Sequence, residues 1–210
     1  SVQEAADLTY GAFDLAEKYR HIGIIAADGN IGQMMEPVEL PPPRSIEKTD
    51  RGWELTGNLG RPRRIITSIY LQPEILHEHN VTLQIKQLEI EKNEVRYAEH
   101  DMDDADYVVV AFGSSARASL TAAHWAREKG IRVGVFRPIS LYPFPYGRLA
   151  EISKRVRAIL DVEMNAGQML EDVRLAVAER VPVSFCGRMG GMVPFPDEIL
   201  PEIEKMVEKK

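Results

Sequence analysis

The first 36 residues combine a helical pattern with an apolar run of the kind found in buried strands. Apolar side chains recur every three or four residues over 1–20, which predicts an amphipathic helix. The run from Ile22 to Ala27 predicts a strand covered on both faces, and Asp28-Gly29-Asn30 ends it with a turn. A helix followed by a buried strand is the end of an α/β unit. We therefore expect the rest of that sheet to come from outside this sequence.

Residues 37–101 are interpreted as a linker. Three consecutive prolines at 41–43 favour an extended chain, and glycines at 52, 57 and 60 interrupt regular structure. Pro73 predicts the start of an amphipathic helix that continues to about residue 92. This helix is expected to pack one apolar face against a domain surface. The apolar residues assigned to that face are Leu76, Leu83 and Ile90, with Val81, Ile85 and Leu88 beside them.

Residues 102–210 alternate between predicted strands and predicted helices. The strands are expected at 107–112, 131–136, 158–163 and 181–186, and the helices at 116–129, 146–153, 167–179 and 198–210. Such alternation predicts an α/β domain built on a mostly parallel sheet, with helices on both faces.

Composition and charge narrow the classes of function. The 210 residues carry a formal net charge of −6, which argues against nonspecific nucleic-acid binding. The basic cluster from Arg61 to Arg64 is interpreted as a solvated loop or contact patch. No apolar stretch approaches the ~20 residues that span a bilayer. The single cysteine, Cys186, cannot hold an iron–sulfur cluster and suits a reducing, cytoplasmic setting.

Two short segments are candidate sites. Gly113-Ser114-Ser115 lies between a predicted strand and a predicted helix, where backbone N–H groups can hold an anion; a plain serine N-cap is the alternative. The polar segment 162–169 follows another strand, at the end of a parallel sheet where ligands usually bind. It can equally cap the following helix or contact another subunit.

The sequence yields no acid–base, nucleophilic or metal-binding set. His77 and His79 lie two residues apart on the predicted helix and therefore point in different directions. Thiamine enzymes use an Asp-Gly step to hold magnesium diphosphate, but their motif places its asparagine much further along the chain than Asn30. Asp28-Gly29 is therefore interpreted as a turn.

Several motifs, in this order, resemble the alpha-type subunit of 2-oxoacid:ferredoxin oxidoreductases. The resemblance spans essentially the whole chain and is nearest to the branched-chain (2-oxoisovalerate) type. It is carried by Ser1-Val2-Gln3-Glu4, the segment from Ala26 to Glu36, Glu94-Val95-Arg96-Tyr97, Phe112 to Arg117, Phe136-Arg137-Pro138-Ile139, Tyr142-Pro143-Phe144-Pro145, Glu163 to Gln168, and Gly187-Arg188-Met189-Gly190-Gly191.

The resemblance implies the C-terminal part of a two-part subunit. Residues 1–36 would end a pyrimidine-binding thiamine domain, and residues 102–210 would form a domain like the C-terminal domain of transketolase. The implied holoenzyme oxidatively decarboxylates a 2-oxoacid to an acyl-CoA with thiamine diphosphate, magnesium, 4Fe–4S clusters and CoA, and it reduces ferredoxin. The implied partners are a beta-type thiamine-binding subunit, a gamma subunit and a ferredoxin-like iron–sulfur subunit, in an oligomer.

The family's substrate loop and cofactor-activating glutamate would precede Ser1, and its other cofactor motifs belong to partner subunits. No catalytic, cofactor-binding or metal-binding residue is therefore assigned here. Gln33, Asn165 and Gln168 are hypothesised to lie at a domain or subunit interface. The leading interpretation is an assembly module that is inactive alone. The alternative is a free-standing α/β protein that binds a small anion at Gly113-Ser114-Ser115.

Overall fold

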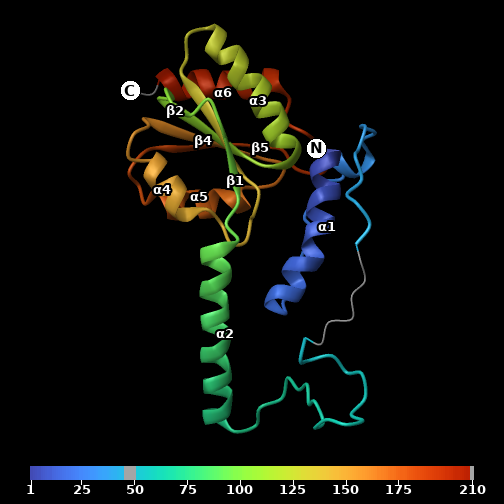
Figure 1. Ribbon diagram of the computed structural model, residues 1–210. Helices are drawn as coiled ribbons and strands as arrows, with labels where there is room; N and C mark the ends of the chain where they lie inside the picture. The colour runs from blue at the N-terminus through green and yellow to red at the C-terminus, as the bar shows by residue number, and fades with distance from the viewer. Residues whose placement is uncertain (45–50, 209–210) are drawn as a thin grey trace.

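The computed structural model describes residues 1–44 and 51–208. An α/β domain lies at one end of the molecule, and helices α1 and α2 lie below it in Figure 1. The helices are α1 Val2–Tyr19, α2 Pro73–Asn93, α3 Gly113–Glu128, α4 Tyr146–Ile152, α5 Gln168–Val177 and α6 Pro196–Glu208, with a short 3₁₀ turn, η1, at Ile31–Gln33. The strands are β1 Tyr97–His100, β2 Tyr107–Ala111, β3 Val133–Pro138, β4 Ala158–Glu163 and β5 Val183–Gly187.

The five strands form one sheet in the order β1-β3-β2-β4-β5. Strands β2, β3, β4 and β5 run parallel, and Val109 of β2 lies between Val135 of β3 and Leu160 of β4. The mostly parallel α/β fold predicted from the sequence is confirmed. Strand β1, which pairs antiparallel with β3, was not predicted. Residues 97–100 therefore belong to the sheet and not to the linker expected over 37–101.

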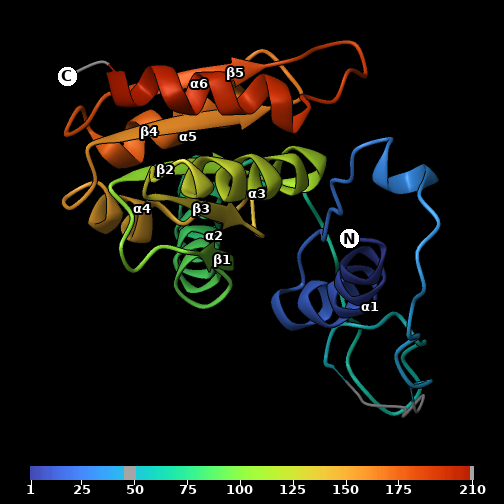
Figure 2. The ribbon, with the colours of Figure 1, turned by 90° about the horizontal axis from the view of Figure 1, so that it is seen from above.

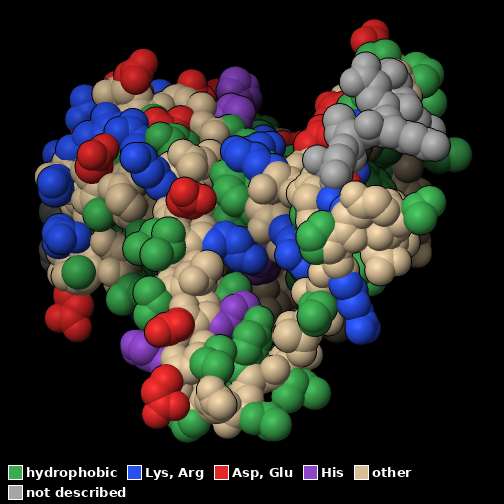
Figure 3. Space-filling view, turned by 60° about the horizontal axis from the view of Figure 1, so that its bottom comes forward, with side chains coloured by type: hydrophobic (Ala, Val, Ile, Leu, Met, Phe, Trp, Pro, Cys, Tyr) green, Lys and Arg blue, Asp and Glu red, His purple; other side chains and the backbone are tan. Residues whose placement is uncertain are grey.

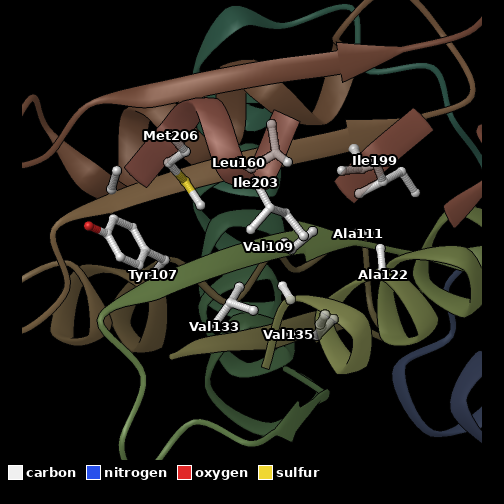
Figure 4. Close-up of a cluster of buried hydrophobic side chains, with 14 of the residues drawn as sticks. Tyr107, Val109, Ala111, Ala122, Val133, Val135, Leu160, Ile199, Ile203 and Met206 are labelled. Carbon is white, nitrogen blue, oxygen red and sulfur yellow. The ribbon is translucent and has the colours of Figure 1, made fainter. Parts of the chain in front are cut away.

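Helices cover both faces of the sheet. Alternate side chains of β2 point to opposite sides, so Val109 packs under α3 and α6, whereas Val110 packs toward α4 and α5. Figure 2 shows α3 and α6 lying over the sheet. In Figure 4, Ile199 and Ile203 of α6 meet Val109 and Leu160 in the core beneath them. Full burial of one such side chain stabilises the fold by about 1.5–3 kcal/mol.

The strand predicted at 22–27 does not form. Within the described residues no other strand pairs with this run, and Ile22 and Ile24 are 79% and 81% exposed. A strand needs a neighbour to satisfy its backbone N–H and C=O groups, so an apolar run without a neighbour takes no sheet structure. Helix α1, predicted over 1–20, is confirmed.

Helix α2 forms where predicted, but its expected packing is wrong. Only Ile90 of its apolar residues is buried. The residues assigned to one face lie on two opposite sides, because a helix turns by about 100° per residue. Leu76, Leu83 and Ile90 occupy one side, and Val81, Ile85 and Leu88 occupy the other.

The N-termini of two helices differ from the prediction by two or three residues. Helix α3 begins at Gly113, three residues before the predicted start, so Gly113-Ser114-Ser115 is its first turn and not a separate loop. Helix α6 begins at Pro196 rather than at residue 198. Residues 209–210 of that predicted helix and 45–50 of the predicted linker lie outside the described residues.

Candidate functional site

The carboxyl ends of the parallel strands are the place where sheets of this kind usually bind ligands. Strand β2 leads directly into α3 there, and β4 leads through a short turn into α5. The N-termini of both helices therefore point unpaired N–H groups and positive dipole ends at this edge. What fills those two helix ends decides what the edge can bind.

The N-terminus of α3 holds a carboxylate from the same chain. The Ser114 backbone N–H donates to Asp28 Oδ2 at 2.9 Å, and the Ser114 hydroxyl donates to Asp28 Oδ1 at 3.0 Å. The Ile31 N–H also donates to Oδ1, at 2.8 Å, and the Asn30 amide donates to the Ser114 hydroxyl oxygen. Asp28 therefore occupies the position that a free anion would take at Gly113-Ser114-Ser115. We call this contact the Asp28 latch.

Gly113 makes the close approach of Asp28 geometrically feasible. Its φ of +58° lies in the left-handed region, which residues other than glycine rarely adopt. A Cβ at this position would stand 2.8 Å from Asp28 Oδ2, far inside contact distance. Burial alone would raise the pKa of Asp28, but hydrogen bonds from Ile31 and Ser114 outweigh it and hold that pKa below the usual aspartate value.

Further ion pairs and hydrogen bonds join residues 1–36 to the α/β domain. Arg137 donates to both carboxylate oxygens of Glu4, at 2.9 and 2.7 Å. Arg117 donates to Glu36 at 2.6 Å, and Glu36 also accepts from the Val2 backbone N–H at 3.0 Å. Together with the Asp28 latch, these contacts place the N-terminal segment against β3 and α3.

The N-terminus of α5 is also filled by a carboxylate of the chain. Glu163, at the end of β4, is almost fully buried and accepts from the N–H groups of Met169 and Leu170 at 3.0 Å each. Asn165 donates to Glu163 at 2.8 Å and accepts from the N–H groups of Gly167 and Gln168. Within this chain, residues of segment 162–169 therefore perform the capping role considered for them.

Asp161 lies two residues before Glu163 on the same side of β4. It is fully buried, and neither carboxyl oxygen has a hydrogen-bond partner within the described residues. Burial raises the pKa of Asp161 to about 9, and the nearby Glu163 carboxylate adds to the shift. At neutral pH Asp161 is therefore a neutral acid, because two adjacent buried negative charges would repel each other.

A pocket of about 180 Å³ opens beside Glu163 at the carboxyl edge. Asp172, one of its lining residues, accepts a hydrogen bond from the Tyr146 hydroxyl, and this acceptor raises the pKa of Tyr146 to about 12. No cationic side chain lines the pocket, and its carboxylates already accept hydrogen bonds from the chain. The lining residues are Phe112, Leu141, Phe144, Glu163, Asn165, Gln168, Met169 and Asp172.

The structure brings together some of the predicted residues and separates others. Asn165 and Gln168 share the pocket, whereas Gln33 lies exposed in η1 beside the Asp28 latch. Sequence reasoning missed the part played by Asp28, and it considered capping for segment 162–169 without singling out Glu163. A signal for Glu163 was present, since two acidic residues within an otherwise apolar buried strand call for a partner. The sequence pattern offered no comparable signal for Asp28.

Within 1–44 and 51–208, no three His, Cys, Asp or Glu side chains gather as a metal site would need. Among the described helices, none combines the length and apolar character that a membrane span requires.

Residues 105–199 match the family model described as pyruvate:ferredoxin oxidoreductase core domain II. Over 98% of its length the chain is 42% identical to ketoisovalerate oxidoreductase subunit VorB of Methanothermobacter thermautotrophicus, covering 58% of that protein. Over 99% of its length it is 32% identical to 2-oxoglutarate synthase subunit KorA of Archaeoglobus fulgidus, again covering 58%. The chain therefore spans less than two thirds of each relative.

Among solved structures, the fold is similar to 2-oxoglutarate:ferredoxin oxidoreductase from Magnetococcus marinus. The TM-score is 0.70 at 17% identity, and the match covers 92% of this chain and 38% of that one. This likeness concerns the fold alone. It agrees with the mostly parallel α/β arrangement predicted from the sequence.

Proposed function

We propose that this chain is the C-terminal part of the alpha-type subunit of a 2-oxoacid:ferredoxin oxidoreductase, and that it acts there as an assembly scaffold. The observation that carries the proposal is its similarity to VorB along almost the whole chain. The higher identity to VorB than to KorA favours the branched-chain, 2-oxoisovalerate type. The holoenzyme would oxidatively decarboxylate that 2-oxoacid to an acyl-CoA and reduce ferredoxin.

The scaffold role is supported by the way the carboxyl edge is filled. Asp28 occupies the N-terminus of α3, and Glu163 occupies that of α5. An edge whose helix ends already hold internal carboxylates has little capacity for a phosphate or carboxylate ligand. The alternative is a free-standing protein that binds a small anion at Gly113-Ser114-Ser115. The same contacts make this alternative less favoured.

The residues of this chain do not fit the cofactors of the proposed holoenzyme. A 4Fe–4S cluster takes four thiolates, and Cys186 is the single cysteine. The described residues also gather no set of metal ligands for the magnesium of thiamine diphosphate. We therefore propose that the beta-type, gamma and ferredoxin-like subunits bind the thiamine diphosphate, its magnesium and the iron–sulfur clusters. No catalytic step is assigned to residues of this chain.

Residues 1–36 are proposed to complete a pyrimidine-binding domain whose other strands lie outside this sequence. The exposed apolar run 22–27 supports this proposal, because its side chains are those of a buried strand. Gln33, Asn165 and Gln168 are proposed to face neighbouring domains or subunits. Gln33 and Gln168 are exposed, and no side-chain hydrogen bond to another described residue is formed by either.

Assembly with partner subunits tests the proposal. The full-length protein, purified from its native cells, is expected to carry a thiamine-binding subunit and iron–sulfur subunits, and to oxidise 2-oxoisovalerate faster than 2-oxoglutarate. Gln33→Ala with Gln168→Ala should weaken retention of the partners without loss of thermal stability, because neither side chain stabilises its own chain.

The matched control is Gln84→Ala, which alters an exposed glutamine of α2. A chain that purifies alone at the present length, or a complex without 2-oxoacid oxidation, would overturn the enzyme assignment. Unchanged partner retention in the double variant would refute only the interface roles.

A further inference from the structure

The pocket beside Glu163 is the right size for a small ligand and too small for a nucleotide-sized cofactor. Its volume of about 180 Å³ lies below the roughly 300–1,000 Å³ of sites for cofactors and drug-sized molecules. A cavity of about 150 Å³ accommodates benzene, so this pocket suits a group of about five or six non-hydrogen atoms. It extends inward from exposed Leu141 and Gln168 to Glu163, which is 1% exposed. A ligand that enters therefore reaches a carboxylate.

The two carboxylates of the pocket receive hydrogen bonds from neutral groups alone within the described residues. Glu163 accepts from two backbone N–H groups and from the Asn165 amide, and Asp172 accepts from the Tyr146 hydroxyl. Such donors hold a carboxylate in its ionised form but do not balance its charge. The pocket therefore favours a cation.

Neighbouring cations of the chain leave this charge unbalanced. Figure 3 shows Lys and Arg side chains intermixed with Asp and Glu side chains over the face of the molecule drawn there. Arg148 of α4 pairs with Glu99 at 2.6 Å and with Glu151 at 3.2 Å. Arg174 of α5 is exposed and forms no ion pair in the part of the chain that the structure describes. The carboxylates of the pocket thus remain for a ligand to neutralise.

The pocket lining also has capacity for three more hydrogen bonds from a donor. Oε1 of Glu163 accepts once, from Leu170, whereas a carboxylate oxygen has about two acceptor positions. Oδ2 of Asp172 and the side-chain oxygen of Gln168 accept from no described residue. A primary ammonium group has three N–H donors and no acceptor, so it matches this set. A phosphate or carboxylate would instead meet two negative charges.

The apolar part of the lining suits an aliphatic stem behind the ammonium group. Phe112, Phe144 and Met169 supply this surface. Aromatic rings also attract a cation that lies within about 6 Å of the ring centroid. A bare metal ion would leave the apolar surface uncovered, and the described residues gather no set of metal ligands here.

We propose that the pocket binds a primary ammonium group on a short aliphatic stem, as carried by a free alkylamine or by a lysine side chain. The proposal stands apart from the proposed enzyme assignment, because every residue of the lining belongs to this chain.

Binding of n-butylammonium to the full-length protein tests the proposal, since this probe has the stem and charge of a lysine side chain. Saturation-transfer NMR titrations measure its Kd. 1-Butanol, which lacks the charge, and butyltrimethylammonium, which lacks N–H donors, should each bind about tenfold more weakly, because each loses charged hydrogen bonds. Equal binding of either analogue would overturn the proposal.

Substitution of Asp172 locates the binding site. Asp172→Asn should weaken n-butylammonium binding about tenfold, because it removes one charge while keeping an acceptor for the Tyr146 hydroxyl. Glu171→Gln is the matched control; it removes the same charge from the next residue of α5, which does not line the pocket. Circular dichroism and thermal unfolding check that both variants fold. An equal effect of the two substitutions, or no effect of Asp172→Asn, would contradict the assigned site.

Zero-length carbodiimide coupling distinguishes the two sources of the ammonium group. In the assembly with its native partners, a lysine side chain in the pocket would become joined to Asp172, and mass spectrometry would identify that lysine. Excess n-butylammonium should then suppress the cross-link. A free alkylamine as ligand predicts no cross-link, with n-butylammonium binding to the assembly itself. Absence of both the cross-link and n-butylammonium binding would refute the proposal, whatever the assembly oxidises.

Discussion

At the residue scale, the least expected side chain is Asp161, a fully buried acid without a hydrogen-bond partner in the described chain. An ionised carboxylate there would be costly, because it would lose its hydration and face Glu163. Glu163, two residues away, avoids this cost through three hydrogen bonds, two of them from the N-terminus of α5. The two acids of β4 thus differ in their hydrogen bonding, although they lie two residues apart on the same strand.

The raised pKa of Asp161 predicts a pH-dependent loss of stability. The unfolded chain releases this proton near pH 4, whereas the folded chain keeps it to about pH 9. The folded state binds one more proton across that window, so the free energy of unfolding falls as pH rises, by up to about 1.4 kcal/mol per pH unit. Asp161→Asn removes this pH-dependent contribution to stability, because an asparagine side chain does not ionise.

The variant Asp161→Asn is therefore expected to be more stable than the parent, by a margin that widens from pH 5 to pH 8. Urea unfolding at both pH values measures this margin. Asp103→Asn, an exposed aspartate on the approach to β2, should show no such trend. An equal margin at both pH values would mean that Asp161 is ionised in the folded chain.

At the scale of elements, α3 begins where it does because of Gly113. The glycine turns the chain out of β2 with a positive φ, and this turn presents the Ser114 N–H to Asp28. Propensity arguments placed the helix start at the first alanine, after the small polar residues. They could not anticipate that a carboxylate 85 residues earlier would cap the first turn.

Gly113→Ala is expected to destabilise the chain by about 1–2 kcal/mol from left-handed strain alone. A further loss should come from displacement of Asp28, whose Oδ2 stands 2.8 Å from the added Cβ. In an Asp28→Ala background only the strain should remain, so the two substitutions should be strongly non-additive. Thermal or urea unfolding of the four proteins measures the coupling. Strict additivity would show that Asp28 does not occupy the N-terminus of α3.

At the scale of the whole molecule, the Asp28 latch and the pairs Glu4–Arg137 and Glu36–Arg117 hold residues 1–36 against the α/β domain. These contacts are polar, whereas the isoleucines of the apolar run 22–27 are exposed. A segment attached in this way is available to a second body on its other side, as the proposed assembly role requires.

Loss of the latch is expected to loosen residues 1–36 while the sheet stays intact. Asp28→Asn removes the charge that α3 holds, which should cost about 1–2 kcal/mol locally and speed amide exchange in α1 by about fivefold to thirtyfold. Because the pKa of Asp28 is lowered, its stabilising effect is complete above about pH 4 and is lost as pH falls further.

The parent should therefore lose protection of α1 below about pH 4, whereas Asp28→Asn should already lack it at pH 7. Hydrogen exchange resolved by residue measures both, with the strands β2 and β4 as the internal reference. Asp7→Asn is the control, because the Asp7 side chain accepts a hydrogen bond from Gln3 within α1. Faster exchange in β2 and β4 as well would indicate general destabilisation in place of local release.

The sequence alone determined the elements whose signals are local. A continuous apolar run predicted β2, and Pro73 predicted the first turn of α2, because burial on both faces and proline geometry leave their mark within a few residues. Only the tertiary structure decided the features that depend on a distant partner. Residues 22–27 have the composition of a strand but form none without a neighbour, and β1 has no apolar signal but pairs with β3 at the edge. The Asp28 latch joins residues far apart in the chain, and hydrogen bonding between such residues follows from the fold and not from their spacing.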